Sequence, residues 1–476
     1  MLRVLVPFVS LLLSLHLFAA GHDLSPTAAR QLRPVVTANG SGLTAAWIEE
    51  TGAPKRRVLA GRVSAGGQPL DGAGIQLDQS LATSIAIAHS SSEALIVWGT
   101  SEGVVAARLS PFGSVLDPLP ILIARQPFPS IAVAWNGERY FVLWTDSFEL
   151  FGAFVSREGT MTSPMQLGSQ SALRHYLSAP DVAWDGHQFI VVFSEVVIEG
   201  QVQCGECPQP APDHVNVMRV SANGDAIDAI PIRIPGLHVR AHVASSGAES
   251  LIALDSDSDT STMVVREENG GLQLAPEAPL LHWFSNIGSA VAWDGSTYSV
   301  AWRSPTWANT PGWLGVSRIT PAGDALLSLV TTVGPADYSQ PMTPSVTASD
   351  TGEIVLVAAE MVPLSSVSHA RFYRMAELAP PSPAPAAPHD VVSHFSGSSA
   401  LVEWQSDAGA SGFLIEESNA FGVVWFPVAV TSDVRSTTVP FAAVGNLLRV
   451  SAFGPGRLSA AAVTSITSPP RRRVSR

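Results

Sequence analysis

The sequence is poor in lysine, in cysteine and in charge, and these shortages exclude several classes of protein. Of its 476 residues, 27 are Lys or Arg and 40 are Asp or Glu, so charged residues make up 14% of the chain, against ~25% in a typical globular protein. With 46% hydrophobic residues, a disordered or coiled-coil chain is ruled out. Lys55 is the only lysine. The net charge of −13 argues against nucleic acid as the principal partner, because a phosphate-binding face needs a basic surface.

Long hydrophobic runs are absent except at the N-terminus. Met1–Ala20 carries one positive charge at Arg3, an apolar run over Val4–Phe18, and small residues that continue to Gly21. This is the pattern of a secretory signal peptide, so residues 1–20 are expected to be removed. An uncleaved anchor is the alternative, although the run is shorter than the ~20 residues of a spanning helix. No cysteine follows these small residues, so a lipoprotein anchor is not expected. We expect a mature protein without a transmembrane segment, either secreted, periplasmic or at the cell surface.

Cysteine occurs at only two positions, Cys204 and Cys207. With no second pair the zinc-ribbon pattern fails, and with no helix start beside them a redox motif is disfavoured. In an exported protein the spacing predicts a local disulfide that closes a loop.

Catalytic signatures are also missing. The chain has no H-E-x-x-H, no G-x-x-x-x-G-K-[ST] and no G-x-S-x-G, which excludes the commonest zinc-protease, nucleotide-binding and hydrolase patterns. His238 and His242 lie four residues apart on a predicted strand, where their side chains share a face without converging on a metal. No cofactor is expected, with one candidate exception.

That exception is a run of alternating carboxylates, Asp255, Asp257 and Asp259. Oxygen ligands at alternate positions are typical of the start of a calcium loop. The glycine expected at the sixth position is Thr260, however, and the twelfth position is Arg266. The run is therefore interpreted either as a calcium site or as a polar hairpin tip.

What the chain does contain is a repeat of about 50 residues. Each copy has a β-rich run, a turn that is often Asn-Gly or Asp-Gly, and a second β-rich run that usually ends in an aromatic residue. Such turns between such runs are the strongest local signal of a hairpin. The equivalent positions are Trp47, Trp98, Trp144, Phe193, Leu254, Trp302 and Ala358. A third strand, a glycine turn and a short fourth strand follow in most copies.

Four strands in each repeat of this length are typical of a propeller blade. The prediction is an all-β chain whose residues 22–379 form a seven-bladed β-propeller, with six or eight blades as alternatives, similar to secreted bacterial propeller repeat proteins. The seventh repeat lacks a fourth strand. We therefore expect residues 23–30 to complete it, which pairs both free edges and closes the ring. The repeated aromatic residues are expected to be core residues between blades.

A different pattern follows a Pro/Ala-rich linker at residues 380–388. Residues 389–468, with Trp404 in an early strand and the later segment Arg449–Ala452, resemble a fibronectin type III domain. The resemblance implies an immunoglobulin-like β-sandwich that acts as a spacer or protein-binding unit. The tyrosine usual before the Arg-Val pair is Leu448 here, so the tyrosine-corner hydrogen bond is absent. Residues 469–476 form a basic tail that is expected to be disordered.

The sequence thus predicts an exported binding or scaffold protein whose partner is a protein or glycan at the cell surface. Ligands are expected on a propeller face or in the central channel, at loops that vary between repeats. Trp307 and Trp313 are candidates for stacking on sugar rings, or for anchoring their own loop. The competing hypothesis is a carbohydrate-active enzyme, a lyase or glycosidase with a catalytic propeller.

Overall fold

The protein is known from a computed structural model. The structure describes residues 21–40, 42–52, 55–64, 67–146, 148–169, 175–197, 214–236, 238–256, 260–281, 288–304, 312–333, 343–349, 351–361, 367–377, 385–396, 399–407, 410, 412–418, 425–431, 434–440, 445–454 and 457–467. In these ranges the only helix is the 3₁₀ turn η1 (Met375–Glu377), and no helix there has the length and apolarity needed to cross a bilayer. The predicted signal peptide, most of the linker and the basic tail lie outside these ranges.

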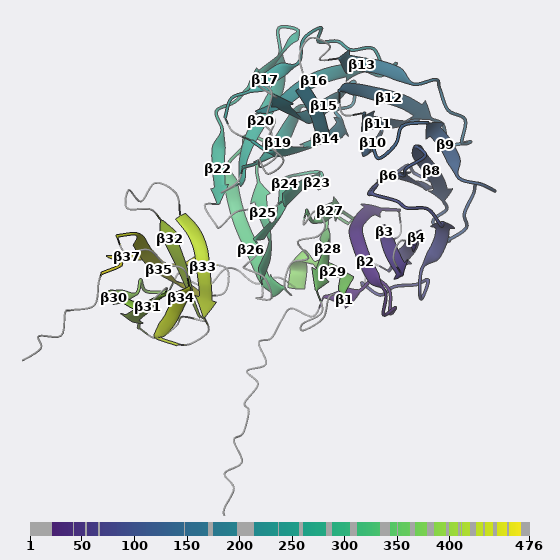
Figure 1. Cartoon of the computed structure of the whole chain (residues 1–476). Coiled ribbons are helices and arrows are strands. Elements are labelled where there is room, and N and C mark those ends of the chain that lie inside the picture. The colour runs from purple at the N-terminus through teal and green to yellow at the C-terminus, as the bar shows by residue number, and fades with distance from the viewer. Residues whose placement is uncertain are drawn as a thin grey trace, which may run out of the picture.

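The described residues between 22 and 374 form small antiparallel sheets, most of them made of four consecutive strands (Figure 1). The first four sheets contain β2 (Arg30–Ala38), β3 (Leu43–Gly52), β4 (Lys55–Val63) and β5 (Ile75–Asp78); β6 (Ser84–His89), β7 (Ala94–Gly99), β8 (Val104–Leu109) and β9 (Ile121–Ala124); β10 (Ser130–Trp135), β11 (Tyr140–Thr145), β12 (Glu149–Val155) and β13 (Met165–Ser169); and β14 (His175–Trp184), β15 (Gln188–Val197), β16 (His214–Ser221) and β17 (Ile232–Ile234). The next three contain β18 (Arg240–Ser245), β19 (Glu249–Asp255), β20 (Thr260–Glu268) and β21 (Gly271–Leu274), with β22 (Ala278–Leu281) also on β20; β23 (Gly288–Trp293), β24 (Tyr298–Ser304), β25 (Gly312–Ile319) and β26 (Ala325–Val333); and β27 (Ser345–Ala348), β28 (Ile354–Met361), β29 (Ser368–Arg374) and β1 (His22–Asp23).

The first strand of each sheet contacts the first strand of the next, and β27 contacts β2 in the same way. The sheets therefore form a closed ring around an axis (Figure 1). A ring of four-stranded antiparallel sheets is a β-propeller.

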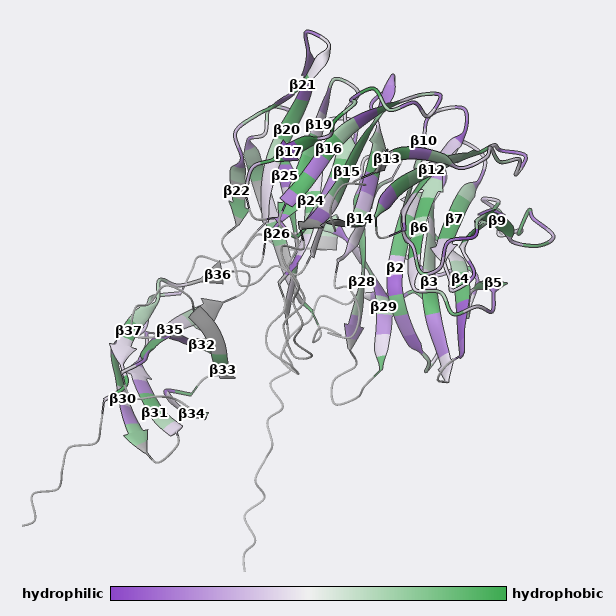
Figure 2. Cartoon of the chain, turned by 45° about the horizontal axis from the view of Figure 1, so that its top comes forward, coloured by the Kyte–Doolittle hydropathy of each residue, from purple (hydrophilic) through white to green (hydrophobic). Residues whose placement is uncertain are grey.

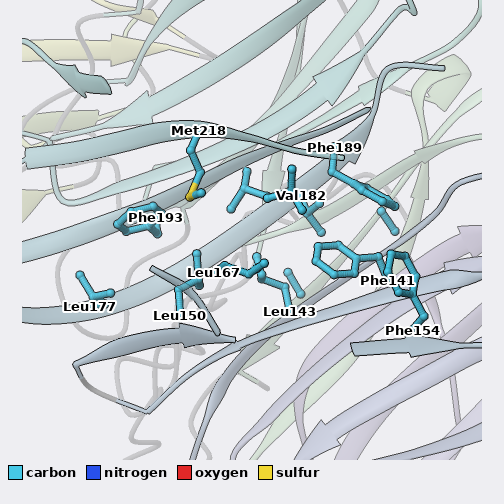
Figure 3. Packing of buried hydrophobic residues seen from close by; sticks show 14 residues of the cluster. Phe141, Leu143, Leu150, Phe154, Leu167, Leu177, Val182, Phe189, Phe193 and Met218 are labelled. Atoms are coloured by element: carbon cyan, nitrogen blue, oxygen red, sulfur yellow. The ribbon is translucent and has the colours of Figure 1, made fainter. Parts of the chain in front are cut away.

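The seven equivalent repeat positions all lie in the second strands of these sheets and are all buried. Each pair of neighbouring sheets shares an apolar cluster, the pair that joins last to first included. Figure 3 shows the cluster between the third and fourth sheets, where Phe141, Phe154 and Phe189 pack together with ring centroids 4.6–6.1 Å apart. The aromatic side chains are thus core between the blades, as predicted. Figure 2 shows that the strands of the ring carry both hydrophobic and hydrophilic segments.

The ring is closed by the N-terminal segment. His22 and Asp23 of β1 pair with Phe372 and Arg371 of β29, and Leu24 is buried in the cluster between the last and first sheets. The predicted closure is confirmed, but the strand is shorter than expected. Residues 23–30 were assigned to it, whereas β1 ends at Asp23 and Arg30 already begins β2.

A repeated ion pair links neighbouring blades. In three sheets an arginine of the third strand binds an aspartate nine residues later, through its guanidinium and its backbone N–H; the pairs are Arg62–Asp71, Arg108–Asp117 and Arg219–Asp228. The guanidinium of Arg219 also donates to the carbonyl of Gly270 in the next sheet, at 2.9 Å. The pair therefore fixes the turn within one blade and its contact with the next.

Residues 389–467 form two further antiparallel sheets. One contains β30 (His389–Ser396), β31 (Ser399–Gln405) and β34 (Ser436–Pro440); the other contains β33 (Trp425–Thr431), β32 (Gly412–Ser418), β35 (Leu447–Gly454), β36 (Arg457–Leu458) and β37 (Ala462–Ser465). The two sheets share one apolar cluster, in which Trp404 packs on Phe413 with ring centroids 5.1 Å apart. Leu448, at the position of the missing tyrosine, is fully buried in the same cluster.

Candidate functional site

A cavity of about 930 Å³ lies at the centre of the ring. It is lined by residues of the first strand, or the residues just before it, in every one of the sheets that form the ring. Its volume falls within the range of small-molecule sites, ~300–1,000 Å³. The cavity is the candidate site, because a concave surface built by many strands can hold a ligand with little rearrangement.

Five ionisable side chains line this cavity: Arg33, Asp181, Arg240, His242 and Asp255. The rest of its wall is apolar or carries hydroxyl groups. Ionisable groups gathered in one partly enclosed cavity are typical of a functional site.

The central pair of the site is Asp181 and His242, from the neighbouring strands β14 and β18. Nδ1 of His242 lies 3.2 Å from Oδ2 of Asp181, and the same oxygen accepts the backbone N–H of Val243 at 3.1 Å. Burial opposes protonation of His242, but the hydrogen bond and negative charge of Asp181, with the charge of Asp255, outweigh burial and raise its pKa. Nε2 of His242 has no hydrogen-bond partner among the described residues.

A bulge in β14 positions Asp181. The register of β14 on β15 shifts between Ser178 and Asp181, and Ala179 has a φ of +45° directly before Pro180. The α-region that a chain would otherwise use for a bend is disfavoured before proline, and the left-handed region is costly for a residue other than glycine. The local sequence thus stores backbone strain next to the site, as functional sites often do.

Arg33 sits in the equivalent bulge of β2, again before a proline. Its φ is +49°, and the register of β2 on β3 shifts between Leu32 and Val35. Burial first, and then the positive charges of Arg240 and Arg56, lower the pKa of Arg33 to about 10. Arg33 therefore stays charged at neutral pH while it shares one environment with other arginines.

Arg240 and Asp255 lie opposite each other in the register of β18 and β19. The Arg240 guanidinium contacts the hydroxyl of Thr343 at 3.4 Å. The carboxylate of Asp255 accepts the Thr260 hydroxyl at 2.8 Å and the backbone N–H of Ser289 at 2.9 Å. Asp255 is only 1% exposed, so it anchors β19 to its neighbours.

Of the predicted calcium ligands, the structure therefore places Asp255 in a buried structural role, while Asp257 and Asp259 lie outside the described residues. No group of three or more metal-ligating side chains occurs in the described part of the chain. His238 and His242 are not a pair, since Nε2 of His238 lies 3.1 Å from the carbonyl of Pro235 and His242 binds Asp181. The calcium site stays a prediction.

Of the other predicted site residues, some lie outside the described residues and one is described. Cys204 and Cys207 lie outside the described residues, so the disulfide stays a prediction, and so does the role of Trp307. Trp313 was expected in a loop, but it lies inside β25 and is 4% exposed. Trp313 is therefore a buried strand residue in this structure, and a stacking role for it stays a prediction.

A second buried polar cluster was not expected from the sequence. Oε2 of Glu195 lies 2.6 Å from Nε2 of His214 and accepts a hydrogen bond from Asn216 at 2.8 Å. Arg233 lies 2.7 Å from the same His214 nitrogen. These side chains satisfy one another at the end of the fourth sheet, where they hold β15, β16 and β17 together.

Comparisons with known proteins found weak structural resemblances only. No protein-family model matches it, and no curated protein does. Three solved structures that resemble it are the Dos1 propeller (8% identity, TM-score 0.43, 74% of this chain and 94% of that one), the β-propeller domain of the Trilobed protease from Pyrococcus furiosus (9%, 0.41, 73% and 97%) and a polysaccharide lyase, the PL25 ulvan lyase (9%, 0.42, 73% and 94%). At these scores they say nothing of what the chain binds, and the fold assignment rests on its own sheets.

Proposed function

We propose that this chain is an exported, non-enzymatic binding protein. In this proposal a seven-bladed β-propeller takes a small ligand in its axial cavity. The fibronectin type III-like module at residues 389–468 acts as a spacer or a protein-binding unit.

The observation that carries the proposal is the axial cavity with its five ionisable residues. A merely structural propeller axis needs no buried charge, since charges are costly to remove from water. Arg33, Arg240 and His242 in a space of this size are instead suited to fix the orientation of a polar ligand.

The state of the two carboxylates favours binding over glycosidic-bond chemistry. A glycosidase needs two carboxyl groups that face the substrate, one as acid and one as base or nucleophile. Here Asp181 accepts backbone N–H groups from Val182 at 2.8 Å and from Val243 at 3.1 Å, and both oxygens of Asp255 accept hydrogen bonds from the fold. Both carboxylates are thus committed to holding strands in place.

The test is a thermal-shift screen with neutral sugars, acidic sugars and amino acids, paired with an assay for released reducing sugar or unsaturated product on polysaccharides. A compound that binds only the folded state raises the melting temperature, and the shift grows with the logarithm of its concentration relative to Kd. The variant Ala86→Phe, which fills the cavity wall, should abolish the shift, and Ala226→Phe on an exposed turn should not. Product release would instead support a lyase or glycosidase, and shifts that survive Ala86→Phe would place binding outside the cavity.

A further inference from the structure

The axial cavity has a charge pattern that points to a class of ligand. Arg33 enters it from β2, and Arg240 and His242 enter it from β18. Arginine presents a planar fork of donors that matches a carboxylate in two-point geometry. Two such groups in one cavity give a carboxylate more donors than either would alone.

The charged residues of the cavity wall bear on the sign of the charge that the ligand carries. The two arginines are offset by Asp181 and Asp255, the only other charged residues that line the cavity within the described chain. Protonation of His242 then leaves one positive charge. A ligand carboxylate would meet the two guanidinium groups and, when His242 is protonated, a third cationic side chain.

The remainder of the wall suits a ligand rich in hydroxyl groups. The cavity is lined by the hydroxyl side chains Ser84, Ser130, Ser178, Ser256, Thr343 and Ser345. A hydroxyl both donates and accepts, so it can pair with a sugar hydroxyl in either sense. Ser345, for example, uses one lone pair for the N–H of Val36 at 3.1 Å and keeps its own proton to donate.

We propose that the axial cavity binds an acidic sugar, whose carboxylate is held by Arg33, Arg240 and the protonated ring of His242. This inference rests on the proposed binding function and adds to it the chemical class of the ligand. His242 keeps Nδ1 on Asp181, and its protonated ring adds positive charge beside the ligand carboxylate. Binding therefore takes up a proton whenever His242 starts neutral, and affinity falls as pH rises.

The groups around His242 are consistent with that linkage. Asp181 faces it from β14, Asp255 from β19 and Arg240 from its own strand. The neighbouring β15 carries Glu195, whose carboxylate is bound to His214 and Asn216, and β23 carries no charged residue. Because Arg33 keeps its charge up to about pH 10, His242 is the cavity group whose charge changes across the physiological pH range.

The experiment is isothermal titration of the full mature chain with D-glucuronate and, as a neutral match, D-glucose. We expect glucuronate to bind at least about tenfold more tightly than glucose at low pH, since a charge-assisted hydrogen bond contributes more than this ratio requires. Arg33→Ala and Arg240→Ala should each weaken glucuronate binding about tenfold or more. Arg240→Lys should restore part of the loss, and Arg266→Ala on the outer ion pair with Glu249 should change nothing.

The pH dependence gives a second readout. Glucuronate affinity should fall between pH 5.5 and 8.5 in the natural chain, and His242→Gln should flatten the profile. Equal affinity for glucuronate and glucose would overturn the inference, as would a glucuronate affinity unchanged in both arginine variants. If glucose binds and Ala86→Phe blocks it, the binding function stands and the acidic ligand is wrong. If neither sugar binds and the library gives no shift, both proposals fail.

Discussion

The carboxylate of Asp181 and the imidazole of His242 join two neighbouring blades at the axis of the ring. Oδ2 of Asp181 lies 3.2 Å from Nδ1 of His242 and also accepts the N–H of Val243. Ser345 makes the same link between the last and the first blade, where its Oγ accepts the N–H of Val36 at 3.1 Å. Asp181 thus occupies a structural position of the repeat, and His242 gives that position a titratable partner.

The first prediction concerns stability against pH. The folded-state pKa of His242 lies above its unfolded value of about 6.5, mainly because Asp181 outweighs the effect of burial. The resulting stabilisation is therefore complete below about pH 6.5 and is lost as pH rises through the folded pKa. Asp181→Asn should remove this pH dependence and lower the histidine pKa. Urea unfolding from pH 5 to 9, with NMR titration of the His242 ring, measures both effects; an unchanged titration in Asp181→Asn would contradict the pairing.

The second prediction concerns the Arg219–Asp228 ion pair within the fourth sheet. Arg219→Ala leaves the carboxylate of Asp228 without its guanidinium in a site where the two side chains are 6% and 13% exposed. Breaking a buried pair typically costs about 3–5 kcal/mol, and equilibrium unfolding should show a loss near the lower figure. The control Arg266→Ala breaks a more exposed pair and should cost about 1 kcal/mol or less. Equal losses in the two variants would show that the Arg219–Asp228 pair contributes no more to stability than an exposed ion pair.

The same pair predicts a response to acid. Burial alone would raise the pKa of Asp228, but the hydrogen bonds and charge of Arg219 outweigh burial and lower it. This stabilisation is present above the unfolded aspartate pKa of about 3.9 and is lost as pH falls through the lower folded value. Asp228→Asn should therefore flatten the decline in the free energy of unfolding below about pH 4. A decline as steep as in the natural chain would assign acid sensitivity to other groups.

The third prediction concerns closure of the ring. Leu24 is 3% exposed and packs between the last and first sheets. Leu24→Ala should lower the free energy of unfolding by about 2–5 kcal/mol, the usual cost of such a truncation in a core. Leu70→Ala, at a position that is 54% exposed, is the matched control and should have little effect. A similar small effect at Leu24 would mean that the N-terminal segment does not hold the ring closed.

The fourth prediction concerns packing of a core tryptophan. A Cβ added at Gly315 would lie 2.2 Å from the Trp302 ring. Gly315→Ala should therefore force the ring out of place and destabilise the chain by about 1–3 kcal/mol. At Gly168 an added Cβ meets nothing within 4 Å, so Gly168→Ala serves as the control. Thermal unfolding and tryptophan fluorescence of both variants measure the difference, and an unshifted Trp302 environment in Gly315→Ala would contradict the packing.

The ring was predictable because its signal repeats along the chain. Trp47, Trp98, Trp144 and Trp302 recur at one position of a local hairpin, and each is buried between blades. The missing fourth strand of the last repeat also predicted closure by the N-terminal segment. The length of the closing strand was overestimated. The residues after Asp23 show no alternation of apolar and polar side chains that would separate this strand from the loop before β2.

The candidate site was not predictable in the same way. Arg33, Asp181 and His242 stand in three different repeats, in apolar strands that otherwise resemble their neighbours, and only closure of the ring brings them to one axis. One signal was available, since these strands are the ones that carry an ionisable side chain where other repeats have alanine or serine. The acidic run at Asp255 was the stronger local pattern, yet its first member is a structural residue.

The most direct test of the binding account is a crystal structure of the mature protein grown with D-glucuronate. The account predicts ligand density in the axial cavity, with the carboxylate on Arg33 and Arg240 and beside the ring of His242. An empty cavity with glucuronate bound on an outer face or on the C-terminal module, under conditions where titration shows saturation, would contradict it.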